Sequence, residues 1–218
     1  MIGFPGLSGT AERFTCIGDR IGGDELQLVA LDPRGRGASE KTAPGSYGWE
    51  NHARDVLAVG DALGFERFSM VGHSMGGSVA MKTAELDAHR LHRVVLIDIA
   101  GRVDRGVGAV IAATIEDLRV VDSQAPHRTS PEAVEEDRAY TWTQHPYDRW
   151  QHLTVPTLLV RATRELRPGS GYVVPAADRD LFMRDVPQAT LVEVDADHVT
   201  ITEHPDTARA TRSFLTAP

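Results

Sequence analysis

The chain has a single cysteine, Cys16, and only two lysines, Lys41 and Lys82, among its 218 residues. One cysteine excludes a disulfide within the chain. No apolar run approaches the length of a membrane-spanning helix, and no signal peptide is visible. The net charge of −8 argues against nucleic acid or an anionic membrane surface as a partner. We therefore expect a cytoplasmic protein that binds neither.

Cofactor motifs are also missing. The sequence has no Cys/His cluster of the kind that holds structural zinc, and no phosphate-binding glycine loop of the Walker type. We expect no metal and no cofactor. Hydrophobic residues make up 41% of the chain and charged residues 25%, which is ordinary for a globular protein. A length of 218 residues suits one domain with a sizeable core.

Apolar segments of strand length alternate with segments of helical spacing, which predicts an α/β fold with a mostly parallel sheet. The expected strands are 26–31, 68–73, 93–98, 157–162 and 190–195. The expected helices outside the middle of the chain are 10–21, 47–63, 176–186 and 205–215, with one more after residue 74. Residues 101–150 break this rhythm with helical patches at 107–120 and 131–142 and no strand. They predict a small helical cap within one domain, 1–218.

The segment from Phe68 to Ala80 is apolar up to the glycine at 72 and rich in small residues after it, which predicts a strand, a tight turn and a helix. The turn Gly72-His73-Ser74-Met75-Gly76 fits the pattern G-x-S-x-G. A serine on such a sharp turn has strained backbone angles, so its neighbours two positions away must lack side chains. The turn predicts that the Ser74 hydroxyl projects outward as a nucleophile and that the Met75 N–H faces a developing oxyanion.

At this point the chain resembles the α/β-hydrolase superfamily, from Gly3 to its end. The motifs that carry the resemblance stand in family order: Gly3-Phe4-Pro5-Gly6, Asp32-Pro33-Arg34-Gly35-Arg36-Gly37-Ala38-Ser39, Gly72 to Gly77, and Asp197-His198. They look like the oxyanion loop, the D-x-R-G-x-G-x-S loop, the nucleophile elbow and the catalytic histidine position. The C-terminal half also resembles thioesterase domains of polyketide synthases, and the N-terminal half is more similar to stand-alone esterases and lactonases.

The resemblance implies a catalytic triad with Ser74 as nucleophile and His198 as general base. It leaves two candidates for the acid. Asp98 matches the thioesterase position, and Glu165 matches the position in most stand-alone hydrolases. We favour Asp98 slightly. The backbone N–H groups of Met75 and Phe4 would form the oxyanion hole.

Other polar and aromatic residues receive structural roles. His73 is expected to support the turn, and His204 to lie at a helix entry. The remaining histidines are interpreted as surface or cap residues: His52, His89, His92, His127, His145 and His152. Arg34 and Arg36 would hold their own loop by hydrogen bonds. Trp142, Tyr147 and Trp150 could line an apolar pocket or pack elsewhere.

Two departures from the family pattern matter. Ile2 stands where the family usually has a histidine before the oxyanion loop. The family also has three strands before the 26–31 strand, and one of them separates that strand from the 68–73 strand. We therefore expect a sheet that lacks its N-terminal strands, in a shortened chain.

The function that we predict is that of a serine hydrolase acting on a small-molecule ester, lactone or thioester through an acyl-enzyme. A cofactor-free perhydrolase would use the same triad. Dehalogenases and epoxide hydrolases fit less well, because they place an aspartate at the Ser74 position. The alternative from another class is a non-catalytic member that binds a small acyl ligand, which the missing strand favours. The sequence does not indicate an oligomeric state.

Overall fold

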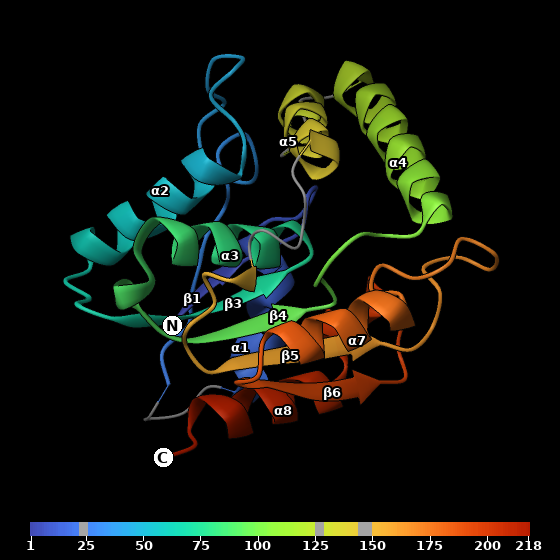
Figure 1. Cartoon of the computed structure of the whole chain (residues 1–218). Coiled ribbons are helices and arrows are strands. Elements are labelled where there is room, and N and C mark those ends of the chain that lie inside the picture. The colour runs from blue at the N-terminus through green and yellow to red at the C-terminus, as the bar shows by residue number, and fades with distance from the viewer. Residues whose placement is uncertain (22–25, 125–128, 144–149) are drawn as a thin grey trace.

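The computed structural model describes residues 1–21, 26–124, 129–143 and 150–218. In this part of the chain, six parallel strands form one sheet in the order β2-β1-β3-β4-β5-β6 (Figure 1). The strands are β1 (Ile2–Phe4), β2 (Val29–Ala30), β3 (Phe68–His73), β4 (Leu91–Ile97), β5 (Thr157–Ala162) and β6 (Ala189–Val194). The expected parallel α/β sheet is confirmed.

The short strand β1 corrects one expectation. It lies between β2 and β3, with Ile2 opposite Val29 on one side and Met70 on the other. The prediction that the sheet lacks any strand between the 26–31 and 68–73 segments is therefore wrong. The 26–31 segment is also less regular than predicted, because only Val29–Ala30 forms a strand.

Apolar residues cover both faces of the sheet. Along β4, Val94 and Leu96 join an apolar cluster with residues of the helices Trp49–Ala62, Met75–Asp87 and Ala176–Asp185. Val95 and Ile97 join a second cluster with residues of the helices Thr15–Ile21 and Pro205–Leu215. All four side chains are fully buried. A strand buried on both faces must be apolar at every position, which explains why this segment does not alternate.

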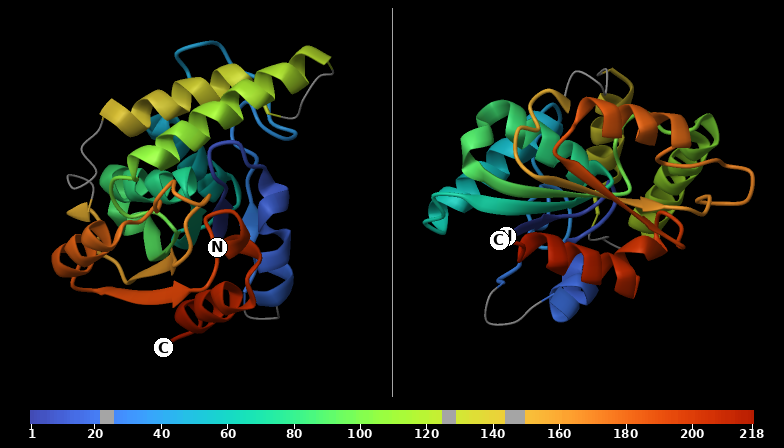
Figure 2. Two further views of the ribbon diagram at one scale, coloured as in Figure 1. Left: turned by 90° about the vertical axis from the view of Figure 1, so that its right-hand side faces the viewer. Right: turned by 60° about the horizontal axis from the view of Figure 1, so that its bottom comes forward.

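Helices form the two outer layers. Two views place α1 and α8 on one face and α2, α3 and α7 on the other (Figures 1 and 2). Their bounds are α1 (Thr15–Ile21), α2 (Trp49–Ala62), α3 (Met75–Asp87), α7 (Ala176–Asp185) and α8 (Pro205–Leu215). Short 3₁₀ turns lie at Ala11–Phe14, Ala88–Arg90 and Thr200–Glu203. None of the helices in the described ranges is long and apolar enough to cross a membrane.

The segment expected to form a cap carries two helices, α4 (Arg105–Gln124) and α5 (Pro131–Thr143). They run side by side above the edge at which the strands end (Figure 2). Because all strands are parallel, the loops that follow β1, β3, β4 and β6 meet at this same edge. The cap helices therefore stand over the segment of the chain that holds Ser74.

Candidate active site

Ser74 occupies a strained turn between β3 and α3. Its backbone angles are φ 54° and ψ −119°, a combination that L-residues rarely adopt. The flanking glycines are required for the close approach of the backbone. A Cβ on Gly72 would overlap the Gly76 carbonyl, and a Cβ on Gly76 would overlap the carbonyl of Phe4. The turn predicted from the sequence is thus present, with Ser74 on the wall of a pocket.

The loop after β6 brings His198 to the same pocket. His198 Nδ1 lies 2.8 Å from Asp98 Oδ2, across 100 residues of sequence. The Asp98 carboxylate accepts a hydrogen bond, so Nδ1 is the donor and Nε2 of the neutral ring is left as the base. The Asp98 side chain is only 2% exposed, and its second oxygen accepts the backbone N–H of Ala162 at 2.9 Å. Asp98 therefore holds His198 in one tautomer and one orientation.

Glu165, the other candidate acid, lies elsewhere. Its two carboxylate oxygens accept the backbone N–H groups of Gly169 (2.7 Å) and Gly171 (3.2 Å) in its own loop. Both oxygens are thus used to fold the loop that follows β5. Of the two acid candidates, the structure brings only Asp98 to His198.

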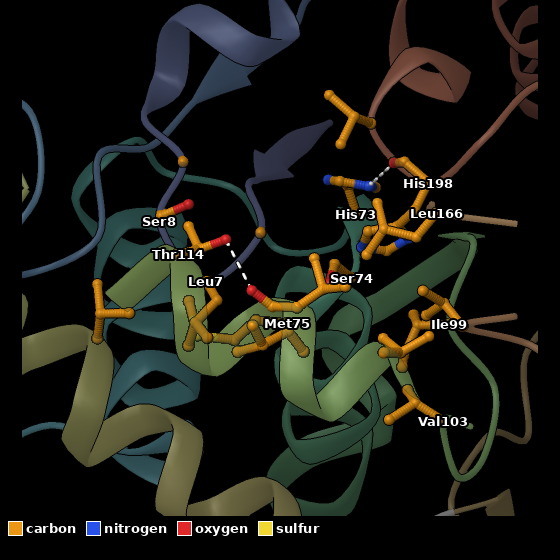
Figure 3. Close-up of a pocket in the computed structure, with 18 of the residues that line it drawn as sticks. Leu7, Ser8, His73, Ser74, Met75, Ile99, Val103, Thr114, Leu166 and His198 are labelled. Carbon is orange, nitrogen blue, oxygen red and sulfur yellow. Dashed lines mark hydrogen bonds between the residues drawn. The ribbon is translucent and has the colours of Figure 1, made fainter. Parts of the chain in front are cut away.

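His73 has a more specific contact than the sequence indicated. Its Nε2 donates a hydrogen bond to the backbone carbonyl of His198 at 2.9 Å, and the two rings lie 4.6 Å apart (Figure 3). Burial lowers the pKa of His73 well below its ordinary value of 6.5, and the adjacent His198 lowers it further. A neutral His73 therefore fixes the backbone of the loop that carries His198.

The pocket has a volume of about 300 Å³, and its wall is largely aliphatic (Figure 3). α4 supplies Val107, Ile111 and Ile115, and α5 supplies Val134. This volume is at the lower end of the range for small-molecule sites. The pocket can therefore hold a compact apolar group beside Ser74.

The two backbone groups expected to form an oxyanion hole are placed differently. Met75 is the first residue of α3 and lines the pocket, so its N–H is one of those that the helix cannot satisfy internally. Phe4 ends β1, is 1% exposed and does not itself line this pocket, whereas Gly6 and Leu7 of the same loop do.

The predicted aromatic lining has a mixed outcome. Trp150 is buried, donates its indole N–H to the Ala100 carbonyl at 2.7 Å and packs edge-to-face on Phe182. It belongs to the core. The side chain of Trp142 and all of Tyr147 lie outside the described part of the chain. Trp49, which the sequence did not single out for the pocket, lines it.

Three polar residues near the site had no predicted link to one another. His52 was expected at the surface or in the cap and is instead fully buried against Asp137 of α5. Arg36 is also fully buried and contacts the same carboxylate. Its two hydrogen bonds to the Leu7 carbonyl go beyond the predicted role of holding its own loop. In the described ranges, no group of three or more His, Cys, Asp or Glu side chains is arranged to hold a metal ion.

A strained serine that shares a pocket with a histidine oriented by a buried carboxylate can supply a nucleophile and a general base. Comparisons with known proteins identify the family and the fold in which this arrangement stands. A sequence model of the family described as "alpha/beta hydrolase fold" matches residues 1–117, more than half of the chain.

Individual proteins share between 21% and 35% of their aligned residues with this chain. An N-formylmaleamate deformylase of Pseudomonas putida is 35% identical over 94 residues, which cover 43% of this chain and 35% of the relative. The crystal structure of the enol-lactonase of Burkholderia xenovorans LB400 has a TM-score of 0.79 at 23% identity, covering 99% of this chain and 91% of the other. E-2-(acetamidomethylene)succinate hydrolase has a TM-score of 0.83 at 21% identity, with coverage of 100% and 91%. The structural likeness shows the fold, and the curated relative is matched over about a third of its length. None of these three is a thioesterase by name, so the thioesterase resemblance stays a prediction.

Proposed function

The chain belongs to the α/β-hydrolase fold family, and from this we propose that it is a serine hydrolase that cleaves an ester, lactone or thioester through an acyl-enzyme. The observation that carries the proposal is the position of Ser74. It stands at positive φ on the wall of a pocket that it shares with His198, and Asp98 holds His198 by Nδ1.

In the first step, the Ser74 oxygen attacks the substrate carbonyl carbon while His198 Nε2 takes the hydroxyl proton. Asp98 stabilises the imidazolium that forms and keeps Nε2 as the base. The oxyanion accepts hydrogen bonds from backbone N–H groups, of which Met75 supplies one and the loop that follows Phe4, whose Gly6 and Leu7 line the pocket, supplies the other. When the tetrahedral intermediate collapses, His198 returns the proton to the leaving alcohol or thiol.

In the second step, water attacks the acyl-Ser74 ester, and His198 takes one proton from that water. The carboxylic acid leaves as His198 returns that proton to the Ser74 oxygen, which restores the hydroxyl. His73 keeps the backbone of the His198 loop in place during these proton transfers by its hydrogen bond to the His198 carbonyl, and its low pKa leaves it neutral. It is a positioning residue and does not exchange protons with the substrate.

The acyl or alkyl group of the substrate would lie against the aliphatic wall formed by α4 and α5. A cavity of about 300 Å³ favours a small molecule with a compact apolar group. The names of the relatives, a deformylase, a lactonase and a succinate hydrolase, are consistent with attack on a carbonyl carbon.

Ser74→Ala tests the proposal. Alanine at φ 54° is strained to the same degree as serine, so we expect an unchanged melting temperature. We expect kcat on p-nitrophenyl esters to fall by at least about 10³-fold, as it does when a triad member is removed. A fluorophosphonate probe should label Ser74 in the wild-type protein and nothing in the variant.

Ser78→Ala is the matched control. Ser78 is a buried serine on α3, the helix that follows Ser74, and also lines the pocket, and this variant should keep both turnover and labelling. Labelling that survives Ser74→Ala would refute the assignment of the nucleophile. Ester binding without any turnover by the wild-type protein would favour a non-catalytic acyl-binding protein instead.

A further inference from the structure

A charged cluster is buried between the cap and the oxyanion loop. Arg36, His52 and Asp137 each have no exposed surface. Asp137 Oδ2 forms an ion pair with Arg36 Nη2 at 2.7 Å and accepts a hydrogen bond from His52 Nε2 at 2.9 Å. Its other oxygen accepts the backbone N–H of Gly48 at 2.6 Å. One carboxylate on the cap helix α5 therefore holds groups from two separate segments, the loop of Arg36 and the start of α2.

The two side chains held by Asp137 contact opposite ends of the Phe4–Leu7 loop. The His52 ring packs edge-on against Phe4, with centroids 5.5 Å apart and planes at 62°. Arg36 donates from Nε and Nη2 to the backbone carbonyl of Leu7, at 3.1 and 2.8 Å. The loop is thus fixed at Phe4 by an aromatic contact and at Leu7 by two hydrogen bonds to one carbonyl.

The loop between these contacts lies directly on the nucleophile turn. A Cβ on Gly6 would stand 3.3 Å from Ser74 Cβ and 3.2 Å from His73 Nδ1, which is tighter than most real contacts. A shift of the loop by a fraction of an ångström would therefore change its distance from Ser74. Electrostatic stabilisation of an oxyanion depends on such distances, because donors must lie at hydrogen-bond length from the developing charge.

The cluster is charged as well as buried. Burial by itself raises the pKa of Asp137, but the hydrogen bonds from His52 and the Gly48 N–H and the charge of Arg36 help to leave it below the ordinary value of 3.8. Burial lowers the pKa of the Arg36 guanidinium below its ordinary value, while the adjacent Asp137 favours the cation. A buried ion pair is weak evidence for stability, because the cost of taking both charges out of water offsets much of their attraction.

We propose that Asp137 is a positioning residue that, through Arg36 and His52, holds the Phe4–Leu7 loop at the distance from Ser74 needed to stabilise the oxyanion. Because Asp137 is carried by α5, the seating of the cap and the formation of the oxyanion hole are coupled. This inference rests on the serine-hydrolase function proposed above and assigns a role to a residue outside the triad.

Glu136 provides a matched control. It is the neighbour of Asp137 on α5 and also binds the loop before α2, accepting the backbone N–H groups of Gly45 (2.8 Å) and Tyr47 (2.9 Å). If Asp137 only fastened that loop to the cap, replacing either carboxylate would have a similar effect. If Asp137 positions the oxyanion loop, only its replacement would change catalysis.

The experiment compares Asp137→Asn, Arg36→Lys and Glu136→Gln with the wild-type protein, using a p-nitrophenyl ester and an alkyl trifluoromethyl ketone that mimics the tetrahedral adduct. Arg36→Lys keeps the cation beside Asp137 but cannot make two hydrogen bonds to the Leu7 carbonyl. We expect Asp137→Asn and Arg36→Lys to lower kcat by about 10- to 100-fold, below the 10²- to 10³-fold loss of a whole oxyanion donor. KM should change by less than about threefold, because the loop acts on the transition state.

The trifluoromethyl ketone should bind each of these two variants more weakly by the same factor as the loss in kcat, and Glu136→Gln should stay within about twofold of wild type. Equal losses in Glu136→Gln, or unchanged kcat in Arg36→Lys and in folded Asp137→Asn, would overturn the inference. If Asp137→Asn does not fold, the kcat of Arg36→Lys alone tests the inference. Turnover that does not depend on Ser74 would instead refute the proposed function, so the two failures can be told apart.

Discussion

Replacement of Asp98 by asparagine should lower kcat greatly if Asp98 is the triad acid and little if Glu165 is. The size of the loss can be worked out from the contacts of the Asp98 carboxylate. Oδ1 accepts the Ala162 N–H at 2.9 Å, and Oδ2 accepts His198 Nδ1–H at 2.8 Å. Asparagine has only one acceptor oxygen. If that oxygen stays on Ala162, the amide NH₂ faces Nδ1, which must then carry the lone pair. The proton moves to Nε2, and His198 can no longer accept the proton of Ser74.

The productive tautomer needs the amide flipped, which sets its NH₂ against the Ala162 N–H and leaves a buried donor without an acceptor. That costs about 1–3 kcal/mol. The lost charge-assisted bond to the imidazolium adds about 1.5–3 kcal/mol. Together they raise the barrier by about 2.5–6 kcal/mol, which corresponds to a fall in kcat of about 10²- to 10⁴-fold at 1.36 kcal/mol per decade. Asp98 has φ 49°, a region that asparagine also tolerates, so the backbone adds little to the cost.

The assay measures kcat on a chromogenic ester and the melting temperature of the same samples of wild type, Asp98→Asn and Glu165→Gln. We expect Glu165→Gln to keep kcat within about threefold, since its loop contacts are those of a partly exposed carboxylate. A large loss in Glu165→Gln beside a nearly unaffected Asp98→Asn would refute the reasoning. Parallel losses of activity and melting temperature in Asp98→Asn would show that Asp98 acts through the fold.

Two further predictions concern His73 and the pocket wall. Because the pKa of His73 in the folded state is below its ordinary value of 6.5, the unfolded chain binds more protons there as the pH falls. The free energy of unfolding should therefore fall below about pH 6.5, by up to about 1.4 kcal/mol per pH unit. Urea unfolding between pH 7 and 5 should show a smaller dependence of this free energy on pH in His73→Gln than in wild type. An equal dependence in the two proteins would contradict the prediction. On the pocket wall, each methylene buried against α4 should raise kcat/KM about fourfold along a p-nitrophenyl ester series, from about 0.8 kcal/mol each. Ile111→Trp should remove this gain while Ala112→Trp, exposed on the same helix, preserves it, and an unchanged profile in Ile111→Trp would place the acyl group elsewhere.

The nucleophile turn could be predicted because its constraints are local. The glycines at 72 and 76 are needed for contacts within a few residues or with the adjacent strand, so they leave a pattern in the sequence. The strand Thr157–Ala162 and the helix Pro205–Leu215 were predicted to the residue for a similar reason, since proline adjoins or begins each one. β2 was predicted too long. The apolar residues of 26–31 suggest a strand of that length, but β1 is so short that only Val29 and Ala30 have partners on it.

The choice between Asp98 and Glu165 could not be made locally. Both residues follow parallel strands that end at the same edge of the sheet, so topology allows either one to approach His198. The decision depends on where each side chain points. Asp98 follows β4 directly and turns at positive φ toward the loop of His198, whereas Glu165 is drawn back by two N–H groups of its own loop. No spacing rule in the sequence contains that difference.

The pairing of His52 with Asp137 could not be predicted for a further physical reason. A histidine on an amphipathic helix and an aspartate in an acidic stretch of a cap both resemble solvated surface residues, and 85 residues separate them. Only the fold shows that they meet Arg36 out of contact with water. Moving such charges out of water costs several kcal/mol per ion, and a well-packed apolar set is often as stable. Stability alone therefore does not account for the cluster, but a demand for fixed distances at the loop over Ser74 does. By the same reasoning, an apolar replacement of all three residues could fold well and still hydrolyse slowly, which would separate the stability of this fold from the geometry of its site.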